Sequence, residues 1–368
     1  MPWVIPVPVR GDDGDNYIGD NSLAYERIHG YGGDDTLAGS TLYDTVFGGD
    51  GNDSVTGHRA EGGAGNDTVF GVQVYGGDGD DNVSTGLTMF DAYGGAGNDT
   101  MATGGYGDSG NDVVYNTFFH AYGGDGNDTV IGTGSFYRLY GGGGNDSVVG
   151  TSGNESIYGD DGDDTLDGGA GNDNILATSG SDIVYGGGGN DELWGQMGRG
   201  LFFGGAGRDG LFGGIGNDTV FGGGGRDLIQ GGGGADWLVG GADDDTVIGD
   251  NGSETIIGGA GLDDMTGYDG SDQFRFRSAE EIGNDWGAGA SFLERITDFS
   301  SGEDVIDLRP MQVDFAWVNT AAFSGHGPEL RFDSSRSWLQ GDVDGDGAAD
   351  FTLHLPGVSS LAASDLLT

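Results

Sequence analysis

Isolated apolar residues recur every nine positions through the middle of the chain, and glycine or polar residues fill most of the intervals. Three residues centred on each apolar one are too few for a helix but suffice for a short strand, whose alternate side chains point to opposite faces. Each unit is therefore predicted to contain a three-residue strand. Over residues 141–275 the apolar residues take the eighth place of fifteen consecutive nonapeptides: Val148, Ile157, Leu166, Ile175, Val184, Leu193, Phe202, Leu211, Val220, Ile229, Leu238, Val247, Ile256, Met265 and Phe274.

The other six residues of each unit follow the pattern G-G-x-G-x-D and are predicted to form a turn. Glycine accepts positive φ, which lets backbone carbonyls crowd toward one point, and the aspartate adds a carboxylate there. One turn supplies half of an oxygen cage, and the next turn on the same side, 18 residues further along, supplies the other half. Such a cage suits Ca²⁺, which takes about six to eight oxygen ligands in adaptable geometry.

The repeat continues upstream in altered form, with sixth-position acids 13 to 18 residues apart. The opposite corner of each coil is shortened or degenerate there, as in "GHRAE" and "GVQVY". We therefore predict ions along one edge for residues 30–140 and along both edges for residues 141–275. Complete upstream turns begin at Gly48, Gly62, Gly76, Gly94 and Gly123, weaker ones at Gly30 and Gly107, and a degenerate first unit at Gly11 has Asn16 in the aspartate position.

The sixth-position aspartates are the candidate calcium ligands. Gly200, in "GQMGRGLFF", has no carboxylate at that position and follows Arg199, so a weak or missing ion is predicted there. Glu155 and Glu254 replace aspartate in two further units. The candidate ligands are Asp35, Asp53, Asp67, Asp81, Asp99, Asp112, Asp128, Asp146, Asp164, Asp173, Asp182, Asp191, Asp209, Asp218, Asp227, Asp236, Asp245, Asp263 and Asp272.

This pattern, G-G-x-G-x-D-x-U-x with U apolar, resembles the RTX calcium-binding nonapeptide repeat over residues 141–275. The resemblance implies an all-β fold, a parallel β-roll that is a right-handed, calcium-stacked solenoid. In that family strands alternate between two parallel sheets, the apolar residues meet inside, and calcium ions line both edges. Calcium is thus the expected cofactor.

The acidic, glycine-rich composition of the chain opposes folding in the absence of a bound cation. The formal net charge is −48 and 84 residues are glycine, so carboxylate repulsion and glycine entropy both oppose folding without a cation. On the order of fifteen to twenty Ca²⁺ would remove most of that repulsion. Such an acidic chain is not expected to bind nucleic acid or to insert into a membrane. With no cysteine, disulfides and thiolate metal sites are excluded.

The repeat pattern breaks at Phe276, where glycine thins out and larger apolar residues increase. The segments "ITDFSSGEDVIDL", "FSGHGPELRFD" and "LQGDVDGDGAADFTLHLPGV" resemble the C-terminal domain of serralysin-type secreted proteases. That resemblance implies a β-sandwich-like cap with an uncleaved signal for a type I secretion apparatus, and an extracellular bacterial protein. The proline-rich N-terminus, "MPWVIPVPVR", argues against a cleaved signal. The expected domains are an N-terminal cap (1–29), an irregular roll (30–140), a regular roll (141–275) and the secretion domain (276–368).

One acidic loop in the C-terminal part forms a separate candidate site. "DVDGDGAAD" places carboxylates at Asp342, Asp344, Asp346 and Asp350, as in the first half of an EF-hand loop. The twelfth position would be Leu353, so the bidentate glutamate of that motif is absent. The alternatives are a further calcium site and an ordinary acidic β-turn.

The sequence offers no recognisable catalytic motif. H-E-x-x-H and G-x-S-x-G are both absent, and the early start of the repeats leaves no room for a separate catalytic domain. We therefore expect a non-enzymatic structural or adhesive protein. The alternatives are a remnant of an RTX hydrolase and a glycan- or ice-binding module. Five successive ninth positions are aromatic and are expected either to stack as ladders or to bind a glycan or protein partner: Tyr185, Trp194, Phe203, Phe212 and Phe221.

Overall fold

The computed structural model describes residues 7–19, 25–40, 42–86, 92–116, 120–133, 138–282 and 293–368. The chain is all-β and divides into two compact units, residues 1–179 and 180–368. Residues 1–6, which carry most of the N-terminal prolines, lie outside the described part. Within the described ranges, no helix combines the length and the apolar character that crossing a membrane requires.

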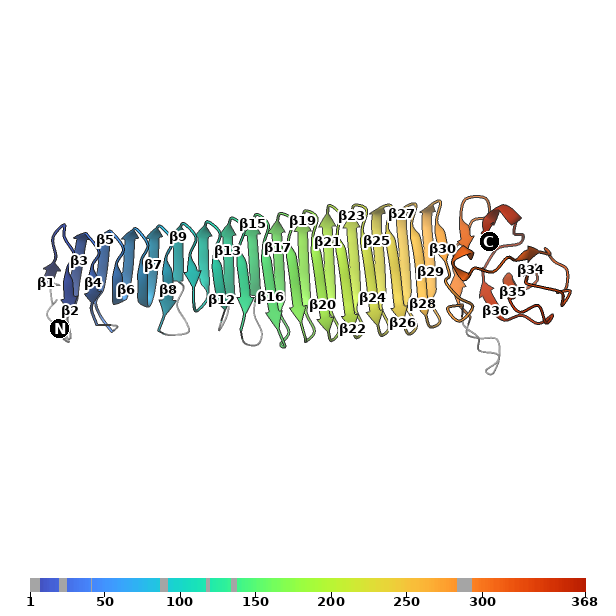
Figure 1. Ribbon diagram of the computed structural model, residues 1–368, viewed down its shortest axis with the longest axis horizontal. Coiled ribbons are helices and arrows are strands. Elements are labelled where there is room, and N and C mark those ends of the chain that lie inside the picture. The colour runs from blue at the N-terminus through green and yellow to red at the C-terminus, as the bar shows by residue number, and fades with distance from the viewer. Residues whose placement is uncertain are drawn as a thin grey trace. The chain divides into compact units, whose positions relative to one another are not determined.

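The first unit is a stack of short parallel strands, drawn from blue to green in Figure 1. Most strands pair with the strand two places along the chain, as Leu139 does with Ile157, 18 residues later. The strands therefore alternate between two parallel sheets. They are β1 Val7–Arg10, β2 Tyr17–Gly19, β3 Glu26–Gly32, β4 Thr36–Ala38, β5 Thr45–Asp50, β6 Ser54–Ala64, β7 Thr68–Asp78, β8 Asn82–Thr85, β9 Ala92–Ala96, β10 Thr100–Met101, β11 Gly105–Ser109, β12 Val113–Asn116, β13 His120–Asp125, β14 Thr129–Gly132, β15 Arg138–Gly143, β16 Ser147–Thr151, β17 Ser156–Asp161, β18 Thr165–Gly169 and β19 Asn174–Ser179.

Two of the degenerate corners of the first unit are bridged by continuous strand rather than by a turn. Strands β6 and β7 are each eleven residues long and contain the segments "GHRAE" and "GVQVY". Strand β6 pairs with β4 through its first residues and with β5 through its last, so it contributes to both sheets. These coils consequently have an acidic turn at one edge only. The corner segment "GSFYRLY" lies largely outside the described residues.

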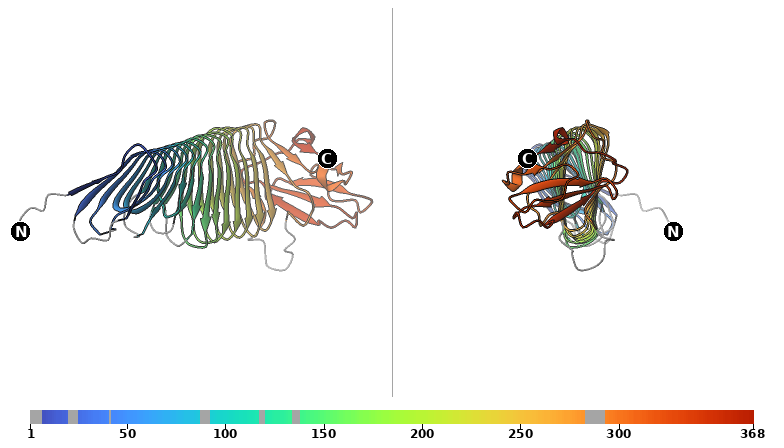
Figure 2. Two further views of the ribbon diagram at one scale, coloured as in Figure 1. Left: turned by 60° about the vertical axis from the view of Figure 1, so that its left-hand side comes forward. Right: turned by 90° about the vertical axis from the view of Figure 1, so that its right-hand side faces the viewer.

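The second unit continues the same parallel pairing and ends in a small antiparallel sheet. Strands β34, β35 and β36 pair antiparallel and lie side by side in orange and red in Figure 2. Its elements are β20 Ile183–Gly188, β21 Glu192–Met197, β22 Leu201–Ala206, β23 Gly210–Ile215, β24 Thr219–Gly224, β25 Leu228–Gly234, β26 Trp237–Ala242, β27 Thr246–Gly252, β28 Thr255–Ala260, β29 Asp264–Gly270, β30 Gln273–Arg275, β31 Arg295–Ile296, β32 Val305–Asp307, β33 Ala316–Trp317, β34 Glu329–Asp333, β35 Trp338–Asp342, β36 Phe351–His354 and β37 Leu366–Leu367, with short 3-10 turns at Arg309–Met311 and Ala363–Asp365.

The predicted interior is confirmed. Every eighth-position residue of the regular repeats is 0% or 1% exposed, from Val148 to Phe274. The upstream equivalents are equally buried, for example Val55, Val69 and Val130. Because each coil contributes its apolar side chains at the same register, the interior of each unit is a column that no single repeat could bury alone.

The prediction of three-residue strands and six-residue turns was wrong. Strand β22 begins at the seventh position of one repeat and runs through the third position of the next, so only three residues, Gly207 to Asp209, make the turn. The glycines join the strand because each pairs with the glycine one coil away, as Gly205 does with Gly187. A Cβ on Gly205, which has φ +110°, would collide with the Gly187 carbonyl, so glycine is needed for packing as well as for conformation.

Two adjacent glycines give a matched test of this packing. Gly223 has φ +113° and its Cβ would collide with the Gly205 carbonyl, whereas a Cβ on Gly224 meets nothing within 4 Å. We expect Gly223→Ala to lower the free energy of unfolding by more than about 1–2 kcal/mol. Gly224→Ala should be neutral or stabilising by up to about 1 kcal/mol. Urea denaturation in calcium measures both, and equal effects would contradict the close coil packing.

Aromatic residues at the ninth position stack along the sheets. Tyr185, Phe203 and Phe221 form one ladder with ring centroids 5.1 and 5.2 Å apart, and Trp194 stacks on Phe212 at 3.9 Å. Sequence reasoning missed a longer tyrosine ladder in the first unit, although its members also follow the coil period. It consists of Tyr75, Tyr93, Tyr106, Tyr122, Tyr140 and Tyr158, with neighbouring centroids 4.4–5.1 Å apart.

Candidate metal centre

The sixth-position carboxylates line the edges of the coils and are buried. Most of the described sixth-position aspartates use one oxygen to accept the backbone N–H of the equivalent residue one coil earlier, as Asp236 Oδ1 does from Asp218 at 2.8 Å. The degenerate first unit obeys the same rule, since the Asn16 N–H donates to Asp35 Oδ1 at 2.7 Å. The two glutamates differ, because Glu155 Oε2 accepts the Thr151 N–H of its own turn and neither carboxylate oxygen of Glu254 has a hydrogen-bond partner. The three-residue turns thus bring the predicted aspartates together in rows, here called the acidic edges, instead of exposing them to solvent.

The second carboxylate oxygen has no hydrogen-bond partner and is buried. Sixth-position aspartates with such an oxygen include Asp35, Asp53, Asp67, Asp81, Asp99, Asp112, Asp128, Asp146, Asp209, Asp218, Asp227, Asp236, Asp245, Asp263 and Asp272. A buried polar atom without a partner is costly, and a whole row of them requires an explanation. A bound cation supplies the missing partner for every member of the row at once.

Carbonyl oxygens surround the same point. A Cβ built on Gly213 would lie 2.6 Å from the Gly231 carbonyl oxygen and 2.7 Å from Asp218 Oδ2. The first-position glycine therefore faces a small space lined by oxygens from two successive coils. Hard oxygen ligands of this kind fit Ca²⁺ better than metals that prefer nitrogen or sulfur ligands.

The electrostatics of the metal-free edges oppose ionisation. Burial, with added repulsion from neighbouring carboxylates, raises the pKa of Asp81 to about 7 and the pKa of Asp245 to about 8. The same causes raise the pKa of Asp67 and Asp236 to about 6. Binding of either a proton or a cation would therefore stabilise each of these buried carboxyl groups near neutral pH.

A second ladder of side chains, at the fifth position of the repeat, was not predicted. Asn52 Oδ1 accepts the N–H of Asn66 at 2.8 Å, and Asn111 Oδ1 accepts the N–H of Asn127 at 2.7 Å. These side chains are exposed and bond toward the following coil, opposite in direction to the sixth-position bonds. The signal was present in the sequence, because Asn or Asp fills the fifth position of most upstream units.

The turn at Gly200 differs from its neighbours in the way the sequence suggested. The ring of Phe202 fills the space that a sixth-position side chain would take, and a Cβ on Gly195 would lie 2.7 Å from Phe202 Cζ. In the next turn of this edge the equivalent neighbour is Asp218 Oδ2. An aromatic carbon thus replaces a ligand oxygen, so the weak or missing ion at this turn stays a prediction with a structural reason.

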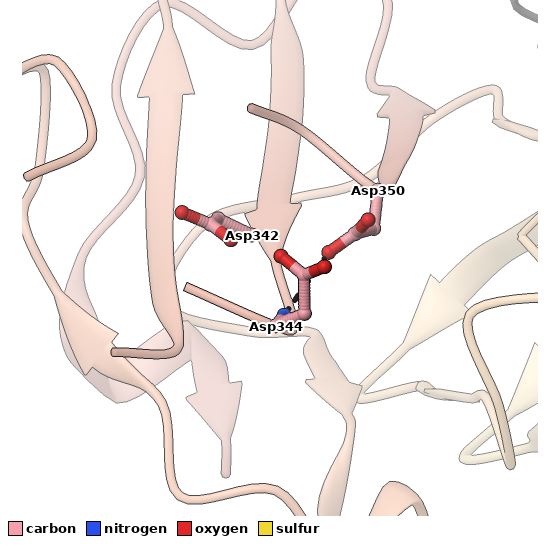
Figure 3. Close-up of side chains that lie close together, drawn as sticks. All are labelled: Asp342, Asp344 and Asp350. Atoms are coloured by element: carbon pink, nitrogen blue, oxygen red, sulfur yellow. Dashed lines mark hydrogen bonds between the residues drawn. The ribbon is translucent and has the colours of Figure 1, made fainter. Parts of the chain in front are cut away.

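The acidic loop after β35 brings three of its four carboxylates together. The side chains of Asp342, Asp344 and Asp350 lie close together in Figure 3. One ligand oxygen from each lies within 4.8 Å of the other two. Both oxygens of buried Asp342 accept backbone N–H groups, with Gly347 N at 2.8 Å from Oδ2. Asp346 is not part of this group and accepts the N–H of Ala348 instead. The loop is an acidic turn whose oxygens could also hold a cation.

Two further carboxylates continue the acidic edges beyond the last regular repeat, and sequence reasoning missed both. Glu294 Oε2 accepts the Asp263 N–H at 2.9 Å, and Asp304 Oδ1 accepts the Asp272 N–H at 3.0 Å. Each is followed two residues later by a fully buried isoleucine, Ile296 or Ile306. That acid-x-apolar spacing could have revealed them, but 13 extra residues between Asp272 and Glu294, and one more between Glu294 and Asp304, hid the nine-residue period.

Buried acidic edges on stacked parallel coils define a calcium-binding β-solenoid. The family model of the RTX calcium-binding nonapeptide repeat matches residues 29–87, 92–105 and 122–277, more than half of the chain. The chain therefore belongs to this family. No curated protein matches it closely.

Proposed function

We propose that this protein is a secreted β-roll that folds when it meets calcium outside the cell and serves there as a structural or adhesive protein without catalytic activity. The observation that carries the proposal is the row of buried, unpartnered carboxylate oxygens along the acidic edges. Such edges are unfavourable in a calcium-poor cytosol and favourable where calcium is abundant. The same chain would thus stay unfolded inside the cell and fold after export.

The free energy that calcium binding is expected to add to the folded state is large compared with the free energy of unfolding of an ordinary domain. A ligand at 100 times its dissociation constant stabilises the folded state by about 2.7 kcal/mol per site. Several such sites exceed the 5–15 kcal/mol that typically separates folded from unfolded domains. Calcium binding would then supply most of the folding free energy, as in other metal-dependent domains.

Export by a type I apparatus is the route we favour. The support is the resemblance of residues 296–308, 323–333 and 339–358 to the secretion domain of serralysin-type proteins. RTX repeat proteins are typically secreted. A glycan or protein of the cell surroundings would be the partner of a structural or adhesive role.

Calcium removal and return test the proposal directly. Purified protein should lose its strand circular dichroism signal in chelator at pH 7.5 and regain it on addition of millimolar calcium. Magnesium at the same concentration should restore little, because it demands tighter octahedral geometry and dehydrates reluctantly. A chain that stays fully folded in chelator would falsify calcium-dependent folding.

A further inference from the structure

The two acidic edges of the second unit end differently. On one edge the last carboxylate is Asp304, which accepts the Asp272 N–H with Oδ1 and the Ser300 N–H, at 2.7 Å, with Oδ2. On the other edge the last carboxylate is Glu294, whose Oε2 accepts the Asp263 N–H while its Oε1 is buried with no partner. Both oxygens of Asp304 thus have protein hydrogen-bond partners, whereas Glu294 leaves one oxygen unsatisfied.

Glu294 is held in place from both sides. Its own carbonyl accepts the N–H of His354 in β36 at 2.9 Å, and the next residue, Arg295, donates its N–H to the Asp263 carbonyl at 3.0 Å. The Arg295 guanidinium also pairs with both carboxylate oxygens of Asp264. With Ile296 fully buried, this segment occupies the sixth to eighth positions of one more coil. The Glu294 side chain is 0% exposed, so Oε1 has no contact with bulk water.

Asp263, the preceding carboxylate of this edge, also has one oxygen without a hydrogen-bond partner. Asp263 Oδ1 accepts the Asp245 N–H at 2.8 Å, while its Oδ2 is buried without a partner beside Gly258. Successive coils of a parallel stack are about 4.8 Å apart, so ligands on adjacent coils can share one ion with Ca–O distances of about 2.3–2.6 Å. Two unsatisfied acidic oxygens on adjacent coils form the start of a cation site.

We propose that Asp263 and Glu294 hold a calcium ion that fixes the C-terminal strands to the last coil of the roll. This inference rests on the proposed function, because it extends calcium binding to a ligand that lies outside the repeats. The backbone carbonyl of Glu294 accepts a hydrogen bond from β36, so Glu294 links the acidic edge to that strand. Residues 293–298 would therefore become ordered only when calcium is bound. The matching position on the other edge, Asp304, would hold no ion.

Counting bound ions in paired variants tests the site. Native mass spectrometry of the calcium-loaded full chain should show one ion fewer in Glu294→Gln than in the unsubstituted protein. Glutamine keeps an oxygen for the Asp263 N–H and replaces the second oxygen, the proposed ligand, with an uncharged NH2 group that cannot bind calcium. Asp304→Asn, at the equivalent position of the other edge, should retain the full count. An unchanged count in Glu294→Gln, or an equal loss in both variants, would overturn the inference.

A second measurement applies even if Glu294→Gln does not fold. Crystals of the unsubstituted protein grown in calcium should show an anomalous peak in contact with Glu294 Oε1 and Asp263 Oδ2. No peak there, with peaks along the repeats, would refute this site and leave the proposed function standing. No peaks anywhere would refute both.

Discussion

Metal-free protein is expected to retain more strand structure at pH 5 than at pH 8. Burial raises the pKa of Asp81 to about 7 and of Asp245 to about 8, whereas an unfolded aspartate titrates near about 3.9. The folded state therefore binds more protons than the unfolded state between these values. For a carboxyl with a raised pKa, the metal-free fold has its full stability below about pH 4 and loses it as the pH rises through about 6 to 8.

Bound calcium should reverse the pH dependence of the stability of the fold. Protons compete with the ion for the same oxygens, so the calcium-loaded fold should weaken as the pH falls. Circular dichroism of calcium-stripped and calcium-loaded protein across pH 4 to 8 compares the two curves. The account is contradicted if the stripped protein is equally ordered, or more ordered, at pH 8 than at pH 5.

The substitution Asp245→Asn is expected to destabilise the fold in the presence of calcium and to stabilise it in the absence of calcium. In calcium it removes a ligand charge and should lower the free energy of unfolding by about 2–3 kcal/mol or more, the contribution of one well-occupied site. Without calcium at pH 8 it should stabilise the chain, because it removes a buried carboxylate whose pKa is raised. Each pKa unit of such a shift corresponds to roughly 1.4 kcal/mol. The net gain should be smaller than the full shift implies, because the asparagine NH2 group is also buried.

Asp243→Asn provides the matched control. Asp243 is exposed, lies two residues away and has φ +75°, a conformation that asparagine tolerates well. It should change stability by less than about 0.5 kcal/mol in either condition. Urea denaturation in calcium measures the first effect on both variants. Circular dichroism of the calcium-stripped variants, followed as the pH is lowered from 8, measures the second, because the stripped chain is expected to be largely unfolded at pH 8. An Asp245→Asn effect of the same sign in both conditions would argue against a calcium role for this carboxylate.

The sequence predicted the coil period, the interior and the members of the acidic edges because each depends on one residue type at one position. Val148 and its equivalents must be apolar to be buried, and Asp146 and its equivalents must be acidic to line an edge. The sequence also showed directly that Gly200 has no carboxylate, which predicted a weak or missing ion there. These features are local to the nonapeptide and repeat often enough to be read without a structure.

Features that depend on contacts between coils could not be predicted in the same way. Strand length was underestimated because glycine is a poor strand former alone, and only pairing with the next coil places Gly205 in a strand. Glu294 and Asp304 follow insertions that conceal the period. The filling of the Gly200 turn by Phe202 depends on side-chain direction, which the pattern of apolar positions does not specify.

An anomalous-scattering map of calcium-loaded crystals tests the central claim most directly. Within the repeats, the account predicts peaks between consecutive carboxylates of an acidic edge, for example between Asp218 and Asp236, and no peak beside Gly195, where the Phe202 ring lies. Well-ordered edges without such peaks, their carboxylates bound only by water or protons, would contradict it.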